Sequence, residues 1–326
     1  MRRQSRGRRR ALPPRDRRGR FAHRLCGRPA AQAGAVDARG RSVRDLPAGA
    51  ERLAGDTFYL PGPTNSGWID GVLIDTGPDE AAYEGRSFDR LLITHGHADH
   101  FACGAYLRRA GTLVHAPRDD ASLIENPEVN IRGMFSWAKP GDLLVTKLFR
   151  GEPCHVDGLV EVWDDRRAAA IPLHGHTLGH TGFLTADGVL FTGDALYQIP
   201  IWERHPLPYC IDPAMVTASL ERIRATEFDV LVPGHGVPCS RQEAEAHIDH
   251  HLGELRAIEE LLVERLKVEH TTEDAIALVS AERGLGDNAA QYWLAVTTVK
   301  GFLGDLLGRG EIEFFVRDHA GWWRTA

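Results

Sequence analysis

Residues 91–100 read LLITHGHADH, an apolar run followed at once by four side chains that can bind a metal ion. The apolar run predicts the end of a buried strand. The residues after it supply His95, His97, Asp99 and His100, and a tight loop can aim these alternate side chains at different points. Imidazole and carboxylate groups suit zinc, iron and manganese, so the run predicts a metal site more firmly than it predicts the metal.

Three further candidate ligands follow, each beside glycine at the end of an apolar run. They are His176 in the stretch LHGHTLGHT, Asp194 in FTGD and His235 in VPGHG. Four ligands on one loop cannot complete two open coordination spheres, and these three residues would supply the rest. Taken singly, a histidine or aspartate at a strand end is more often a structural residue. The prediction therefore rests on the presence of all three residues, in this order, after the first motif.

The motifs HGHADH, GHTLGHTG, FTGDALY and VPGHG, in this order, resemble the metallo-β-lactamase superfamily over about residues 56–240. The resemblance implies an α+β fold, an αββα sandwich of two sheets with the metals in a cleft at one edge. It implies that zinc binds, two ions per chain, with iron or manganese as alternatives. The ligands that it implies are His95, His97 and His176 for one metal, Asp99, His100 and His235 for the other, and Asp194 between them.

Three residues are expected to act beside the metals. Two metals that share a water lower its pKa toward 7 and generate hydroxide at neutral pH, and Asp99 could orient this nucleophile or accept its proton. His180 is expected to steady a ligand or the substrate from outside the metal shell. Tyr197 follows Asp194 at a spacing that resembles the acyl-homoserine-lactone lactonases, whose matching tyrosine polarises the substrate carbonyl, although a tyrosine here can also simply pack.

The complete ligand set and Tyr197 favour a dinuclear hydrolase that uses a metal-bridging hydroxide on a small ester, thioester or lactone, in the manner of glyoxalase II. An alternative is a metal-dependent ribonuclease or phosphodiesterase whose C-terminal segment binds nucleic acid. Another is a mononuclear iron dioxygenase of the persulfide type, which would leave Asp99, His100 and His235 unused. A non-enzymatic alternative is a DNA-binding regulator with a metal sensor. The C-terminal segment argues against a true β-lactamase.

The expected secondary structure forms two successive series of strands with trailing helices, which predicts two packed sheets with helices outside. Residues 118–155 are expected to form an irregular insertion that shapes the substrate pocket. The expected strands are 57–60, 71–74, 91–94 and 111–114, then 159–163, 168–173, 182–185, 189–192 and 230–232. The expected helices are 102–110, 213–224, 241–267, 275–281 and 289–307, with a hairpin over 311–324.

We expect three parts along the chain. Residues 1–48 are Arg-rich, lack periodic apolar residues and are predicted to be a disordered tail, either an upstream extension of little function or a functional arm. Residues 49–240 form the catalytic domain. Residues 241–326 form a small helical, winged-helix-like domain, because two helices and a hairpin follow the first long helix.

Charge and composition limit the partners. Of the 326 residues, 43% are hydrophobic and 26% charged, and no apolar run could span a membrane. The net charge is -6, yet residues 1–44 hold fifteen arginines against two aspartates, so the rest of the chain is strongly acidic. Nucleic acid is therefore a possible but unfavoured partner, and a small-molecule substrate is expected. The sequence leaves the oligomeric state open.

The five cysteines are odd in number, widely spaced and never arranged as CxxC. This pattern argues against a disulfide framework and against a thiolate zinc site. The N-terminal segment also lacks the apolar core of a secretory signal. We therefore expect the protein to work in the cytoplasm.

Overall fold

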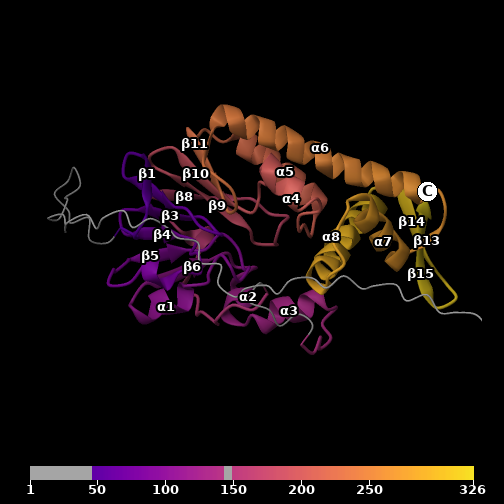
Figure 1. The fold of residues 1–326 in the computed structure, drawn as a ribbon, viewed down its shortest axis with the longest axis horizontal. Coiled ribbons are helices and arrows are strands. Elements are labelled where there is room, and N and C mark those ends of the chain that lie inside the picture. The colour runs from indigo at the N-terminus through magenta and orange to yellow at the C-terminus, as the bar shows by residue number, and fades with distance from the viewer. Residues whose placement is uncertain (1–45, 143–148) are drawn as a thin grey trace, which may run out of the picture. The chain divides into compact units, whose positions relative to one another are not determined.

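The computed structural model describes residues 46–142 and 149–326. The predicted disordered tail, 1–48, lies almost wholly outside the described residues, as does part of the predicted insertion. Figure 1 shows two sheets with helices on their outer sides. Among the described residues, no helix is long and apolar enough to cross a membrane.

The first sheet has seven strands, which lie side by side in chain order. The strands up to β4 are antiparallel, whereas β4 to β7 run parallel, so the carboxyl ends of β4, β5 and β6 meet at one edge. The predicted metal loop begins just beyond β5. The strands are β1 Glu51–Ala54, β2 Thr57–Leu60, β3 Ser66–Ile69, β4 Val72–Ile74, β5 Arg90–Leu92, β6 Leu113–Ala116 and β7 Gly158–Leu159.

The second sheet has five strands in the order β12-β11-β10-β9-β8. Strands β10 and β11 run parallel, joined through helices α4 Ile199–Arg204 and α5 Pro213–Ala225, so the residues that follow these two strands lie at the same edge. Asp194 follows β10 and His235 follows β11 closely. The strands are β8 Ala168–Pro172, β9 Thr181–Thr185, β10 Val189–Gly193, β11 Val230–Pro233 and β12 Cys239–Ser240.

Alternate side chains of each strand build separate cores, as the period of two residues requires. In β4, Val72 and Ile74 face the second sheet and pack in one core with Phe191. Leu73 faces the other way, into a core that includes Leu107 of helix α1 Gly104–Arg109. The second sheet is covered on its outer face by α5 and α6 Arg241–Arg265. The predicted αββα sandwich is confirmed.

The C-terminal helices share a core with the second sheet. Ile248 of α6 and Phe302 of α8 belong to the same buried cluster as Leu231 of β11. Three further strands form a small sheet in the order β13-β15-β14. The observed order is helix, strand, helix, helix, hairpin, and its assignment as a winged helix stays a prediction. These elements are β13 His270–Thr271, α7 Thr272–Glu282, α8 Ala289–Gly308, β14 Ile312–Arg317 and β15 Ala320–Thr325.

The predicted strand at 159–163 is wrong. Strand β7 ends at Leu159, and a short 3-10 helix covers Val160–Val162. The parallel neighbour β6 ends at Ala116, because Pro117 has no amide hydrogen to continue the ladder. The chain therefore turns away toward the second sheet, where the indole of Trp163 donates to the carbonyl of Ala168 at 2.9 Å.

The insertion is more regular than predicted. Its described residues contain helices α2 Ala121–Glu125 and α3 Glu128–Met134. Phe135, at the end of α3, packs against Trp293 of α8 with ring centroids 4.6 Å apart. The insertion thus contacts a C-terminal helix as well as the catalytic part of the chain.

Candidate metal centre

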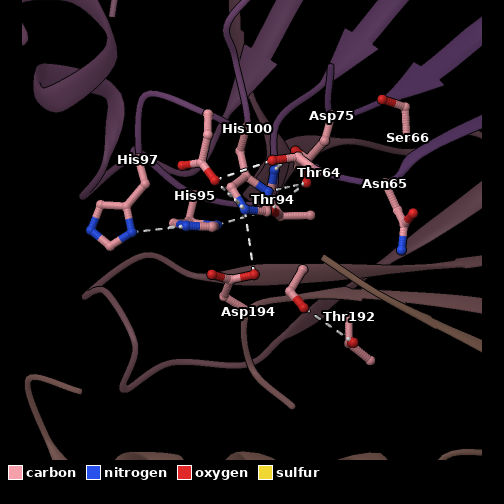
Figure 2. A network of polar contacts seen from close by, with 12 residues as sticks. Thr64, Asn65, Ser66, Asp75, Thr94, His95, His97, His100, Thr192 and Asp194 are labelled. Carbon is pink, nitrogen blue, oxygen red and sulfur yellow. Dashed lines mark hydrogen bonds and ion pairs between the residues drawn. The ribbon is translucent and has the colours of Figure 1, made fainter. Parts of the chain in front are cut away.

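The structure brings all seven predicted ligands together at the edge where β5, β10 and β11 end. Figure 2 shows His95, His97 and His100 on the loop after β5, with His97 directed at His95 and His100 directed at Asp194 of the facing sheet. Among the described residues, three sets of donor atoms lie within 4.8 Å of one another, and one of them, His95, His100 and Asp194, links the other two. We call these other two the three-histidine group, which is His95, His97 and His176, and the mixed group, which is Asp99, His100 and His235.

In the three-histidine group, ring nitrogens point at one another. His97 Nδ1 lies 3.1 Å from His95 Nε2 and 2.8 Å from His176 Nε2. His97 Nδ1 carries either one proton or one lone pair, so it cannot form a well-aligned hydrogen bond with both neighbouring nitrogens at once. Nitrogens bound to one tetrahedral zinc at about 2.0–2.1 Å would lie about 3.4 Å apart, so the cluster fits a metal ion.

The mixed group adds carboxylate oxygens. His235 Nε2 lies 3.3 Å from Asp99 Oδ2, and His100 Nε2 lies 3.8 Å from the same oxygen. His100 Nε2 is buried and has no hydrogen-bond partner among the described residues. A buried donor or acceptor without a partner is costly, and a bound cation would remove that cost by taking the nitrogen lone pair.

Asp194 lies between the two groups. Its Oδ1 is 3.4 Å from His100 Nε2, and its Oδ2 is 3.4 Å from His235 Nε2 and 3.8 Å from His176 Nε2. Within the described residues, Oδ1 is also buried without a hydrogen-bond partner. One carboxylate therefore faces ligands of both groups, which is the arrangement expected of a residue that bridges two metals.

In four of the ligand histidines, the ring nitrogen that faces away from the centre is also held. Such outer bonds fix the orientation and the tautomer of a metal-binding histidine. Backbone carbonyls, a hydroxyl and a carboxylate supply them. His176 Nδ1 lies 3.0 Å from the carbonyl oxygen of Tyr209, and His235 Nδ1 lies 2.6 Å from that of Pro63. His95 Nδ1 lies 3.0 Å from Thr94 Oγ1, and His100 Nδ1 lies 2.8 Å from Asp75 Oδ2.

Carboxylates give the mixed group a high affinity for protons. Burial opposes charge on His100, but Asp194, Asp75 and Asp99 outweigh it and raise its pKa to about 10. Asp194 likewise raises the pKa of His235, to about 11. At neutral pH the metal-free mixed group therefore holds protons that a metal must displace.

The three-histidine group has the opposite electrostatics. Burial and the neighbouring His97 lower the pKa of His176 to about 3. His176 is therefore already neutral at pH 7, and its nitrogen lone pair is available to a metal without loss of a proton.

Of the predicted catalytic residues, Asp99 lies on the open side of the centre. Its side chain is 30% exposed, and its Oδ2 accepts a hydrogen bond from Thr64 at 3.1 Å. Burial raises its pKa, but His100 and His235 outweigh this and hold it well below the usual range. Asp99 is therefore ionised at neutral pH, and its carboxylate can accept a hydrogen bond from a nucleophile and so orient it.

His180 and Tyr197 contact the ligands directly. His180 Nε2 accepts the amide hydrogen of Asp194 at 3.0 Å, and its ring stacks on His95. The Tyr197 hydroxyl lies 3.1 Å from His176 Nδ1 and donates to Asp194 Oδ2 at 3.4 Å. Tyr197 is only 8% exposed, and its predicted contact with substrate stays a prediction.

Sequence reasoning missed three supporting residues. Asp120 follows β6 and accepts hydrogen bonds from two ligand loops. Thr64 holds Asp99, as described above. The amphipathic pattern of α6 predicts that His251 is a surface or packing residue, and it is a buried packing residue whose Nδ1 also accepts the amide hydrogen of Tyr197 at 3.4 Å. Only Asp120 carries a usable signal, since it is an acidic residue close to a strand end.

Comparisons with known proteins identify the family. The family model of the metallo-beta-lactamase superfamily matches residues 59–235. A hydroxyacylglutathione hydrolase of Cereibacter sphaeroides is 30% identical over 166 residues, which are 49% of this chain and 54% of that protein. The chain thus spans about half the length of this curated relative.

Two solved structures share the fold. A metallo-beta-lactamase family protein of Thermus thermophilus aligns over 84% of this chain and 100% of its own, with a TM-score of 0.63 and 20% identity. A beta-lactamase domain protein of Burkholderia ambifaria aligns over 87% and 97%, with a TM-score of 0.59 and 18% identity. At these identities the likeness concerns the fold alone. Since the family model covers more than half of the residues, the chain belongs to the metallo-beta-lactamase superfamily.

Proposed function

We propose that the protein is a metal-dependent hydrolase that holds two metal ions and cleaves a small ester, thioester or lactone. The observation that carries the proposal is the position of Asp194, within 3.8 Å of ligands from both groups. Two divalent ions bound here would lower the pKa of a shared water toward 7 and so provide a nucleophile at neutral pH.

The residues of the chain divide the remaining tasks. Asp99 is ionised and partly exposed, so its carboxylate can accept a hydrogen bond from the nucleophile and orient it. His180 fixes the backbone that carries Asp194, and Tyr197 holds the side chain of Asp194. The buried hydroxyl of Tyr197 could polarise a substrate carbonyl only if the substrate reaches past the ligands that it contacts.

We propose zinc as the metal, two ions per chain, because imidazole nitrogens dominate both groups and Asp194 can supply a ligand to each. The two groups contribute the same number of side chains, three each. Iron or manganese would suit the same donors. The complete mixed group gives no support to a mononuclear dioxygenase, which would leave it unused.

A small acyl compound is the proposed substrate. The relative from Cereibacter sphaeroides is named a hydroxyacylglutathione hydrolase, which supports hydrolysis of an acyl compound. The nuclease alternative gains no support from the C-terminal hairpin, because its arginines are already paired. Arg317 contacts Glu269, and Arg324 lies 2.7 Å from Glu313.

We also propose that the protein works in the reducing cytoplasm. Cys103, Cys154, Cys210 and Cys239 are all free thiols, and all are buried. Burial raises the pKa of the Cys103 thiol to about 12, so this thiol stays protonated and unreactive at neutral pH. These properties suit a protein that does not depend on oxidation for its fold.

The test is a metal analysis of the purified protein joined to a substrate panel of acyl-thioesters, lactones, aryl esters and phosphodiesters. We expect two metal ions per chain and turnover of at least one acyl substrate. His97→Ala and Asp194→Ala should each lower kcat/KM at least about 100-fold, since each removes a ligand. Activity on phosphodiesters alone would refute the acyl proposal, and one iron with oxygen uptake would refute hydrolysis.

A further inference from the structure

Asp120 joins the two loops that carry the three-histidine group. Its Oδ2 accepts the amide hydrogen of Gly96 at 2.8 Å, and Gly96 stands between His95 and His97. The same oxygen accepts the hydroxyl of Thr177 at 2.6 Å, and Thr177 follows His176. The other oxygen, Oδ1, accepts the amide hydrogen of Gly179 at 2.9 Å.

The three hydrogen bonds to the Asp120 carboxylate lie in the interior of the protein. Asp120 is 1% exposed, so water does not compete for its oxygens. Charge-assisted bonds of this kind are short and roughly twice as strong as neutral ones. Asp120 itself belongs to neither ligand group, and it lies at the start of the insertion that follows β6. It therefore acts on the loops rather than on a metal.

The bonds set the distance between ligands that come from different sheets. His97 lies on the loop after β5 of the first sheet, and His176 lies between β8 and β9 of the second. Their facing nitrogens, His97 Nδ1 and His176 Nε2, are 2.8 Å apart. Of the three side-chain hydrogen bonds described for Asp120, one falls on the first loop and two on the second, so its carboxylate ties the loops together beside this pair.

The mixed group has supports of its own. Asp75 Oδ2 lies 2.8 Å from His100 Nδ1. Thr64 holds Asp99, and the carbonyl of Pro63 accepts from His235. None of these contacts passes through Asp120. A change at Asp120 should therefore disturb the two groups unequally.

We propose that Asp120 is a positioning residue that sets the spacing of the three-histidine group and thereby the affinity of that group, and not of the mixed group, for its metal. The inference rests on the metal centre proposed above, but not on any substrate. It predicts that loss of Asp120 weakens one metal-binding step selectively.

The experiment is a titration of zinc into metal-free full-length protein, in competition with a chromophoric chelator. His97→Ala and His235→Ala identify which step belongs to which group. We expect Asp120→Ala to weaken the step that His97→Ala abolishes by about 10–100-fold, the usual effect of removing an outer partner of a metal site. The step that His235→Ala abolishes should change by less than about threefold.

Asp187→Ala is the matched control. Asp187 also ties two segments together, accepting the amide hydrogen of Asp56 at 2.8 Å and the hydroxyl of Thr57 at 2.9 Å, but it lies before β10, at the end of that strand opposite to Asp194. Its loss should lower the Tm without changing either zinc step. Thr177→Val removes only one of the three bonds to Asp120 and should weaken the same step as Asp120→Ala to a smaller extent.

Equal weakening of both steps in Asp120→Ala, or of neither, would overturn the proposal. If Asp120→Ala does not fold, Thr177→Val is the deciding variant. An unchanged zinc affinity of Thr177→Val at the step that His97→Ala abolishes would then overturn the proposal. A wild-type protein that binds a single zinc, at the step lost in His97→Ala, would refute the two-metal function but not the role of Asp120, which is then measured at that step.

Discussion

Gly234 shows how little room the centre leaves at the scale of single residues. A Cβ atom at this position would lie 2.2 Å from Asp194 Oδ1 and 2.7 Å from His100 Cε1. The backbone cannot withdraw freely, because the amide of Gly234 donates to the carbonyl of Gly193 at 2.8 Å. Glycine is needed here for close approach, and the added methyl group would have to displace the Asp194 carboxylate.

We therefore expect Gly234→Ala to reduce the bound metal from two ions per chain to one or none, with loss of activity. Metal content by plasma emission spectrometry on dialysed protein checks this. Gly253→Ala is the control, because Gly253 lies in α6 with open space around it, and alanine there should stabilise the helix by about 0.5–1 kcal/mol. Full metal content in Gly234→Ala would show that the loop can move.

Tyr197→Phe separates two roles of one hydroxyl. Because that hydroxyl contacts His176 and Asp194, we expect its loss to weaken metal binding about tenfold, and we expect saturating zinc to restore most of the activity. Steady-state kinetics over a range of free zinc measure this. Tyr292→Phe is the control, since its hydroxyl binds Glu273 at the surface. A low kcat that persists at saturating zinc would place Tyr197 on the substrate instead.

At the scale of elements, helix α6 contributes a buried titratable residue, His251, which supports the metal centre through Tyr197. His251 is 3% exposed and packs against Trp202 of α4, with ring centroids 5.1 Å apart. Burial lowers its pKa to about 3. Since an unfolded histidine has a pKa near 6.5, its contribution to stability is complete above about pH 6.5 and is lost as the pH falls toward 3.

The free energy of unfolding should therefore fall by about 2 kcal/mol between about pH 7 and pH 5 through His251 alone. His251→Leu should lose this part of the pH dependence, so the gap between wild type and variant narrows as the pH falls. Urea denaturation at several pH values, at constant zinc, measures it. A difference in the free energy of unfolding between wild type and His251→Leu that stays constant with pH would contradict the assignment to His251.

The elements also show what a single sequence can predict. Strands such as β2 and β10 are predictable because their apolar residues are consecutive and a glycine lies close to where they end. Strand β3 escapes prediction because Gly67 interrupts its pattern. In the structure a Cβ at Gly67 would lie 2.6 Å from the ring of Phe191, so the glycine serves the contact between sheets. Sequence periodicity does not contain that contact.

The same limit applies to the site. The seven ligands are predictable because each lies in a short sequence motif whose residue types bind metals. The structure brings all seven together. Asp120 offers only the weaker signal of an acidic residue close to a strand end, and His251 lies in no motif. Their roles depend on partners 57 and 54 positions away, namely Thr177 and Tyr197, and only the packed structure reveals these pairs.

At the scale of the whole molecule, the predicted catalytic and C-terminal parts share one core. Leu231 of β11 packs in the same cluster as Leu252 of α6 and Phe302 of α8. The amide of Cys210 donates to Thr298 of α8 at 3.2 Å, next to the residue whose carbonyl holds His176. The predicted boundary at residue 240 thus crosses a continuous apolar core and a contact that supports the ligand loop.

We expect a chain cut after residue 240 to lose cooperative folding, because the cut would expose the outer face of the second sheet. Near-ultraviolet circular dichroism and limited proteolysis, compared with the full chain, test this. The cut protein should be digested within the region 168–240, where its covering helix is missing. A protease-resistant fragment that still binds two zinc ions would show that residues 49–240 fold as an independent domain.

The division of the ligands between two sheets also bears on the order of events in folding. His97 and His176 are 79 positions apart, and their nitrogens meet only after both sheets have formed and docked. Contacts between residues far apart in the sequence form slowly, because the chain loses the entropy of loop closure before these contacts stabilise it. A metal ion should therefore bind late, after the rate-limiting step. Zinc added during refolding should leave the folding rate unchanged and slow the unfolding rate instead.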